Sequence, residues 1–232
     1  TENAVINIIE AYVIGIILSA LTPLNMFQGC LIAAVVFATY VSFGGLWGTA
    51  ITNLQHVLVM LIALSTIAVL GIREIGGWEQ VTISVGHQLE VSSRDQEAWW
   101  GFVGGGWLAV IGMMFSAVVH SPAASIYPNY SSALKNEKKL PFAFFWGAVI
   151  AAVIPPLAGL IGILTIARYG LNSDLAGYQN FTAIASEINP IAGGLAIAAI
   201  LAAVISSGGP ILLASSTMIV RDWLGSVKSM TS

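Results

Sequence analysis

The chain has 232 residues, of which 57% are hydrophobic and 8% are charged, and its formal net charge is −3. A soluble domain carries about 25% charged residues to keep its surface wetted, so this composition excludes a soluble enzyme. The small negative charge and the lack of a basic run argue against nucleic acid as a partner. Lipid is the solvent that suits such a chain.

The apolar residues gather in segments long enough to cross the hydrocarbon core of a bilayer as helices, which takes about 20 residues. Strands of a membrane barrel would instead alternate over about 10 residues. We therefore predict an all-α, polytopic transmembrane helical bundle with six spans, at about residues 4–22, 28–43, 47–71, 100–123, 142–167 and 191–220. Because the chain starts at Thr1 and ends soon after the last span, we expect an internal fragment of a longer membrane protein.

Polar segments at 72–99, 124–141 and 168–190 are predicted to connect the later spans as loops. Six alternating spans place the loop at 124–141 and the C-terminal tail on one side of the membrane. That side has five Lys and Arg residues, and the other side has three: Lys135, Lys138, Lys139, Arg221 and Lys228 against Arg73, Arg94 and Arg168. Since Lys and Arg concentrate in cytoplasmic loops, we predict a plasma-membrane protein whose loop 124–141 and tail are cytoplasmic.

The sixth span contains the most informative polar residues. Ala203, Ser206 and Ser207 are spaced i, i+3 and i+4, so one carbonyl and two hydroxyl groups share a helix face. Neutral oxygen ligands suit a monovalent cation such as sodium, which a transporter must also release. Pro210 removes a backbone donor, which weakens the helix beside these oxygens. The alternative is that the small residues only allow helices to pack closely.

A carboxylate inside the first span, Glu10, is costly unless it faces a cavity, pairs or is protonated. Glu10 is therefore either functional or close to the membrane interface, if the span begins later than we place it. His56 and His120 are expected to be hydrogen-bonded packing residues. The sequence contains no HExxH, no nucleophile elbow and no phosphate-binding glycine loop, so we predict that the chain is not an enzyme.

Two stretches resemble the sodium:solute symporter family. The first is YVSFGGLW at 40–47 followed by TNLQH at 52–56, and the second is AAVISS at 202–207 followed by SST and RD. The resemblance implies a LeuT-type fold of five-plus-five inverted repeats. Residues 1–71 would be the last three helices of the first repeat and 100–232 the first three of the second, joined by an external loop at 72–99.

The resemblance also implies a role for the polar residues of the sixth span. Ala203 would offer its carbonyl group, and Ser206 and Ser207 their hydroxyl groups, to sodium. The first core helix, which would complete this sodium site, is absent from the chain, so the three residues form only part of the site.

We predict a secondary active transporter that couples sodium to a small organic solute by alternating access. Residues 110–114 are apolar where a sugar would need polar partners, so an organic anion or amino acid is favoured over a sugar. Trp107 and Ser116 in the fourth span are the candidates for solute contact. The alternatives are a proton-coupled transporter of the same fold, which would use Glu10 or a histidine, and a non-transporting membrane subunit.

Overall fold

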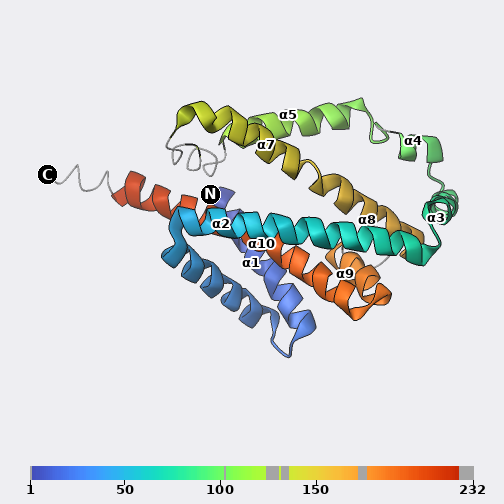
Figure 1. The fold of residues 1–232 in the computed structure, drawn as a ribbon, viewed down its shortest axis with the longest axis horizontal. Helices are drawn as coiled ribbons and strands as arrows, with labels where there is room; N and C mark the ends of the chain where they lie inside the picture. The colour runs from blue at the N-terminus through green and yellow to red at the C-terminus, as the bar shows by residue number, and fades with distance from the viewer. Residues whose placement is uncertain (1, 102, 124–130, 132–135, 172–176, 225–232) are drawn as a thin grey trace. The chain divides into compact units, whose positions relative to one another are not determined.

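The computed structural model describes the chain except residues 1, 102, 124–130, 132–135, 172–176 and 225–232. The side chains of residues 2, 20–21, 120–123, 177–180 and 222–224 are also outside the described part. Among the described residues, all regular secondary structure is helical, which confirms the all-α prediction (Figure 1). Most of the predicted cytoplasmic loop 124–141, the end of the tail and the His120 side chain lie outside the described residues.

The helices follow one another from α1 to α10 with two short non-α turns. Their bounds are α1 (Glu2–Leu21), α2 (Met26–Ile75), α3 (Trp78–Val91), α4 (Gln96–Trp100), α5 (Trp107–Ala123), η1 (Glu137–Lys139), α7 (Leu140–Ala151), α8 (Ile154–Tyr169), α9 (Gly177–Ile188), α10 (Pro190–Met218) and η2 (Ile219–Leu224). Three described stretches are long and apolar enough to cross a membrane: Met26–Ile75, Glu137–Tyr169 and Pro190–Arg221. Shorter apolar helices cover Asn3–Ser19 and Trp107–Val119, and the six crossings remain a prediction.

Helix α2 contains two of the predicted spans, which a single non-helical residue separates. Gly45 has φ 50° and ψ −148°, a conformation that only glycine adopts without strain. Figure 1 shows the chain turning back sharply between the two segments of α2. The expected break between the second and third spans is therefore present at the Gly44-Gly45 pair.

The fourth and fifth predicted spans differ in detail from the helices. The glycine run at 104–106 forms turns, so α5 starts at Trp107 instead of near residue 100. The fifth predicted span is divided into α7 and α8 at residues 152–153. Pro155 and Pro156 lie in the first turn of α8, where the missing backbone N–H of proline costs nothing.

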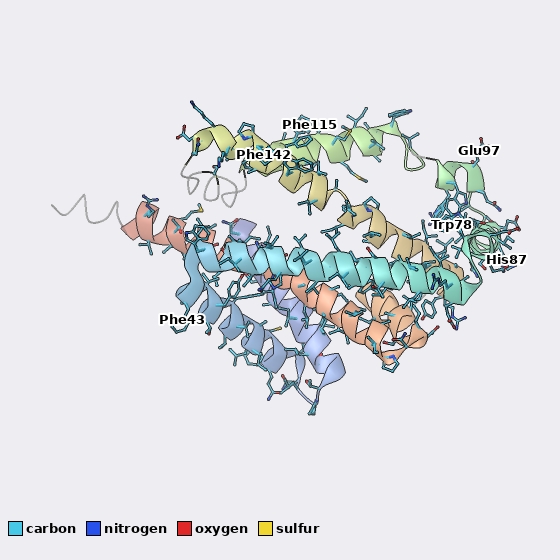
Figure 2. All side chains as sticks on the ribbon, in the orientation of Figure 1. Phe43, Trp78, His87, Glu97, Phe115 and Phe142 are labelled. Atoms are coloured by element: carbon cyan, nitrogen blue, oxygen red, sulfur yellow. The ribbon has the colours of Figure 1, made fainter. Side chains whose placement is uncertain are left out.

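Two of the predicted loops contain amphipathic helices. Segment 72–99, expected as a polar loop, forms α3 and α4, and segment 168–190 contains α9. Val81, Val85 and Leu89 recur every four residues on α3 and are completely buried. This spacing was readable in the sequence, but the helix is too short and too polar to register as a membrane span. Figure 2 shows Trp78 and His87 on α3 and Glu97 on the short α4 that follows it.

The described residues divide into two compact units, and the first contains α1, the first part of α2 and the later part of α10. Its core is built on Ile14, Ala33 and Phe37, with side chains of α10 packed against them. Helices α1 and α2 approach closely at Gly15 and Gly29, since a Cβ atom on Gly29 would lie 2.8 Å from the Cα atom of Gly15. Small residues at a helix crossing are typical of membrane proteins.

The second unit contains the rest of α2, helices α3 to α9 and the start of α10. Helix α8 packs against both α3 and α9. At the end of α8, the Arg168 Nε atom lies 2.9 Å from Glu187 Oε2, and the Tyr169 hydroxyl donates to Glu187 Oε1 at 2.8 Å. These contacts fasten α9 to the C-terminal end of α8.

Large apolar side chains are exposed along the apolar helices of both units. Phe43, Phe115 and Phe142, labelled in Figure 2, lie on α2, α5 and α7 and are 90%, 69% and 68% exposed. A water-soluble protein exposes few contiguous apolar patches of this extent. Contact with lipid, or with further helices, accounts for such surfaces.

Candidate functional site

The three oxygen-bearing residues singled out in the sequence meet on one turn of α10. The Ser206 hydroxyl donates to the Ala203 carbonyl oxygen at 2.7 Å, and the Ser207 hydroxyl donates to the same oxygen at 3.2 Å. Ser207 also lies 3.2 Å from the Val204 carbonyl oxygen. The Ala203 carbonyl oxygen and the Ser206 and Ser207 hydroxyl oxygens therefore form a compact neutral group on α10, here called the oxygen-rich turn.

Helix α10 continues through Pro210, the position at which a weakened helix was expected. Proline has no backbone N–H, so the Ser206 carbonyl loses its regular partner four residues later. The regular helical hydrogen bond to the Ser206 carbonyl oxygen is therefore missing at this turn.

The two glycines before Pro210 allow close contact with α1 and α2. A Cβ atom on Gly208 would lie 2.7 Å from Glu10 Oε2 and 2.7 Å from the Phe37 ring. Gly209 lies directly under the Tyr40 side chain, where no Cβ atom would fit. The packing interpretation of these small residues is therefore correct for the glycines, and it leaves the role of the serines open.

Tyr40 connects α2 to the oxygen-rich turn, and the sequence alone did not single it out for this role. Its hydroxyl group donates to the Ile205 carbonyl oxygen at 3.3 Å. Residues 40 and 205 are far apart in the chain, so no local spacing could have paired them. The tyrosine at the start of the YVSFGG stretch was the only available signal.

Glu10 is buried by the neighbouring helices, with 9% of the residue exposed. Its Oε2 atom has no hydrogen-bond partner among the described residues. The carboxyl group faces the Ser207 side chain on α10. Glu10 therefore lies beside the oxygen-rich turn and not at the end of its helix.

The remaining candidate residues lie elsewhere. Trp107 is 67% exposed at the start of α5, and Ser116 is exposed on the same helix, which belongs to the second unit. His56 was expected to be hydrogen-bonded, but its buried Nδ1 atom has no partner in the described part of the chain. The Asn53 Oδ1 atom, one turn earlier on α2, is also buried and unpaired there.

Comparison with known proteins identifies the family of this chain. Residues 5–231 match the model of the sodium:solute symporter family. Sodium/proline symporters of Staphylococcus aureus, among them those of strains JH9 and Newman, are 26% identical to the chain over 203 residues. The match covers 84% of this chain but 37% of each relative, so the chain spans little more than a third of their length.

No solved structure gives a significant match to the chain. The family match agrees with the apolar helices in identifying an integral membrane protein that takes part in transport and is not an enzyme. It also confirms the resemblance read from residues 40–56 and 202–222. The chain belongs to the sodium:solute symporter family.

Proposed function

We propose that this chain is part of a secondary active transporter that couples sodium entry to the uptake of a small organic solute. The observation that carries the proposal is the oxygen-rich turn of α10, where Ser206 and Ser207 both reach the Ala203 carbonyl oxygen. Family membership supports sodium as the coupling ion. Sodium is a co-transported substrate here and not a resident cofactor.

The chemistry of this turn suits reversible sodium binding. Hard cations prefer oxygen ligands, and neutral ligands hold a monovalent ion less tightly than a set of carboxylates would. The serine hydroxyls can rotate from the Ala203 carbonyl to an ion without any movement of the backbone. Ala203, Ser206 and Ser207 form part of the proposed site, and segments outside this chain would complete it.

The proposed architecture is a LeuT-type inverted repeat with six spans in this chain. Residues 1–71 are the last three helices of one repeat, 72–99 an external connection, and 100–232 the first three helices of the other repeat. The reversal at Gly45 supports two spans within α2, and the clustered lysines at 135–139 support a cytoplasmic face there. Transport proceeds by alternating access, and sodium and solute bind cooperatively and reciprocally.

The proposed solute is an amino acid or a small organic anion. The relatives that match most of this chain are sodium/proline symporters, which makes L-proline the first solute to test. The apolar run at 110–114 on α5 offers few partners for the hydroxyl groups of a sugar. Trp107 and Ser116 on the same helix are proposed to contact the solute.

The test is uptake of radiolabelled L-proline, small carboxylates and sugars by the full-length protein in proteoliposomes, with and without a sodium gradient. We expect uptake to require sodium. The Ser206→Ala/Ser207→Ala variant should need at least about tenfold more sodium for half-maximal uptake, since each lost oxygen ligand weakens binding by about 1 kcal/mol or more.

A matched control is the Ser215→Ala/Ser216→Ala variant of the same helix. These two hydroxyl groups donate to the Ile211 and Leu212 carbonyl oxygens at 2.8 Å, so the control also removes two hydroxyls bonded within α10. We expect the control to keep the sodium dependence of the unmodified protein. Equal sodium dependence in both double variants would count against the proposed sodium site.

A further inference from the structure

Three tryptophan side chains gather in the connection between α2 and α5. The ring centroids of Trp78 and Trp100 lie 6.3 Å apart, those of Trp99 and Trp100 lie 4.8 Å apart, and both pairs meet edge to face. Trp78 is 45% exposed and Trp100 is 41% exposed. These three residues, here called the tryptophan cluster, belong to the second unit, and the proposed sodium site makes no use of them.

Helix α3, which carries Trp78, lies across the end of an apolar segment. Figure 1 shows α3 end-on where α8 runs across the view, and the two helices are in contact. The contact extends to Gly170, which directly follows α8, since a Cβ atom there would lie 2.9 Å from Gln88 Oε1 of α3. The stretch Glu137–Tyr169, which ends with α8, is long and apolar enough to cross a membrane. A helix that lies across the end of a membrane span runs along the membrane surface.

The chain also enters α3 directly from a second apolar segment. Met26–Ile75 is long and apolar enough to cross a membrane, and Trp78 follows its last residue by three positions. Gly76 and Gly77 have φ angles of 108° and 101°, so the chain turns sharply between the two helices. Since three residues span at most about 10 Å, the Trp78 backbone lies close to the end of this segment as well.

Trp78 shares a face of α3 with the residues that pack inside the unit, yet it stays nearly half exposed. Trp78, Val81, Val85 and Leu89 are spaced three, four and four residues apart. The last three are completely buried, so α8 and its neighbours cover this face except at its first position. The other face of α3 carries exposed polar side chains, among them Gln80, His87 and Glu90. The polar face suits water, and the open end of the apolar face is turned toward the side of α8.

We propose that the tryptophan cluster is a membrane anchor, which binds the zone of a phospholipid bilayer where headgroups meet acyl chains. An indole ring combines an apolar body with one N–H donor, and this suits a zone that offers both hydrocarbon and ester carbonyl groups. Glu79, Arg94 and Asp95 are exposed beside the cluster in the sequence, and their charges keep it out of the hydrocarbon core. The inference goes beyond the proposed sodium site and rests on the proposed membrane spans.

The experiment measures the depth of spin labels in the full-length protein, reconstituted in phosphatidylcholine nanodiscs after Cys30 and any other cysteines have been replaced. A nitroxide label is attached to the Trp100→Cys variant. Its collision rates are measured with oxygen, which concentrates in lipid, and with a nickel chelate, which stays in water. We expect this label to lie about 5–10 Å inside the headgroup boundary, the depth at which interfacial helices bury their apolar side chains.

Two labelled control positions calibrate this depth. Ile83→Cys, at a position that is 56% exposed on the other face of α3, should be in water and fully open to the nickel chelate. Val153→Cys, at a position that is 47% exposed in the middle of Glu137–Tyr169, should be the deepest and the least open to the chelate. A label at residue 153 that lies in water would refute the span and the anchor together, and it would leave the sodium site to its own uptake test.

Two results for the label at residue 100 would overturn the inference. Access to the nickel chelate equal to that at residue 83 would mean that the cluster lies in water. Shielding from both oxygen and the chelate would mean that a further segment of the protein or a second copy covers the cluster.

A second measurement needs no cysteine variant. Trp100→Phe keeps an aromatic ring and removes one indole fluorophore. The fluorescence that this variant loses relative to the unmodified protein should be the part that lipids brominated near their ester groups quench and that aqueous iodide leaves unchanged. A lost part that iodide quenches, or that neither reagent quenches, would refute the anchor even if the labelled variants do not fold.

Discussion

The Tyr40 hydroxyl group donates to the Ile205 carbonyl oxygen at 3.3 Å, and the same tyrosine lies directly over Gly209. This contact positions α2 against the turn that carries Ser206 and Ser207. It requires both a long side chain on α2 and a missing one on α10. Tyr40 and Gly209 therefore form a complementary pair, and a change in either residue alone destabilises the packing of α2 against α10.

We predict that Gly209→Ala destabilises the full-length protein by about 1–3 kcal/mol, since the added methyl group displaces Tyr40 from a tightly packed position. The thermal unfolding midpoint in detergent is the measurement. The matched control is Gly194→Ala on the same helix, where a Cβ atom meets nothing within 4 Å. That variant should be neutral or more stable by up to about 1 kcal/mol, because alanine favours a helix. A second-site Tyr40→Ala change should recover part of the loss from Gly209→Ala, and strictly additive effects would contradict this contact.

We predict that Gly45→Ala destabilises the reversal within α2. Its φ of 50° and ψ of −148° lie where a Cβ atom is strained, at a cost of about 1–3 kcal/mol. Gly44→Ala is the control, since its φ is not positive and a Cβ atom there also meets nothing within 4 Å. Equal unfolding midpoints for the two variants would show that the reversal does not depend on the conformation of Gly45.

The ion pair at the end of α8 makes stability depend on pH. The Tyr169 hydroxyl, together with the Arg168 guanidinium, lowers the pKa of Glu187, although partial burial opposes this change. A lowered pKa in the folded protein means that the carboxylate stabilises the fold above its ordinary pKa of 4.5 and loses this effect as pH falls through the folded-state value.

We therefore expect Glu187→Gln to lower the unfolding midpoint at pH 7, and the gap from the unmodified protein to narrow below pH 4.5. The effect should be small, because both charged side chains are about half exposed. Glu97→Gln, at an exposed position on α4, should match the unmodified protein throughout. A gap that widens as pH falls would mean that the sign assigned to Glu187 is wrong.

The amphipathic helix α3 is predicted to stabilise the second unit through its buried face. Leu89 is completely buried between α3 and its neighbours, so Leu89→Ala should cost about 2–5 kcal/mol. Val91→Ala, at a position that is 68% exposed on the same helix, should cost little. Amide hydrogen exchange across 78–91 and the unfolding midpoint together measure the difference. Equal protection in both variants would mean that α3 does not pack as described.

The sequence predicted those parts of the molecule that depend on local spacing. Ser206 and Ser207 reach the Ala203 carbonyl oxygen because residues three and four apart meet on a helix, and that rule needs no tertiary information. The break at Gly44-Gly45 could also be predicted, because it depends on the two adjacent glycines and not on contacts with distant segments. Hydropathy likewise located the apolar segments, because it depends on composition alone.

Contacts between distant segments could not be predicted in this way. Nothing in the spacing of residues 10, 40 and 208–209 indicates that they meet, because helix packing and not chain proximity brings them together. Helices α3 and α9 were mistaken for loops for a different reason: a search for membrane spans passes over short helices with one apolar face. The four-residue spacing of Val81, Val85 and Leu89 was the sequence pattern that indicated the apolar face of α3.

The reversal at Gly45 has a consequence for biogenesis. If both apolar segments cross the bilayer as predicted, the single non-helical residue leaves almost no connecting chain between them, so we expect the two segments to enter the bilayer together. Leaving a single segment outside would also leave about 20 apolar residues open to aggregation. The two segments are therefore expected to leave the insertion machinery as a helical hairpin whose turn depends on Gly45.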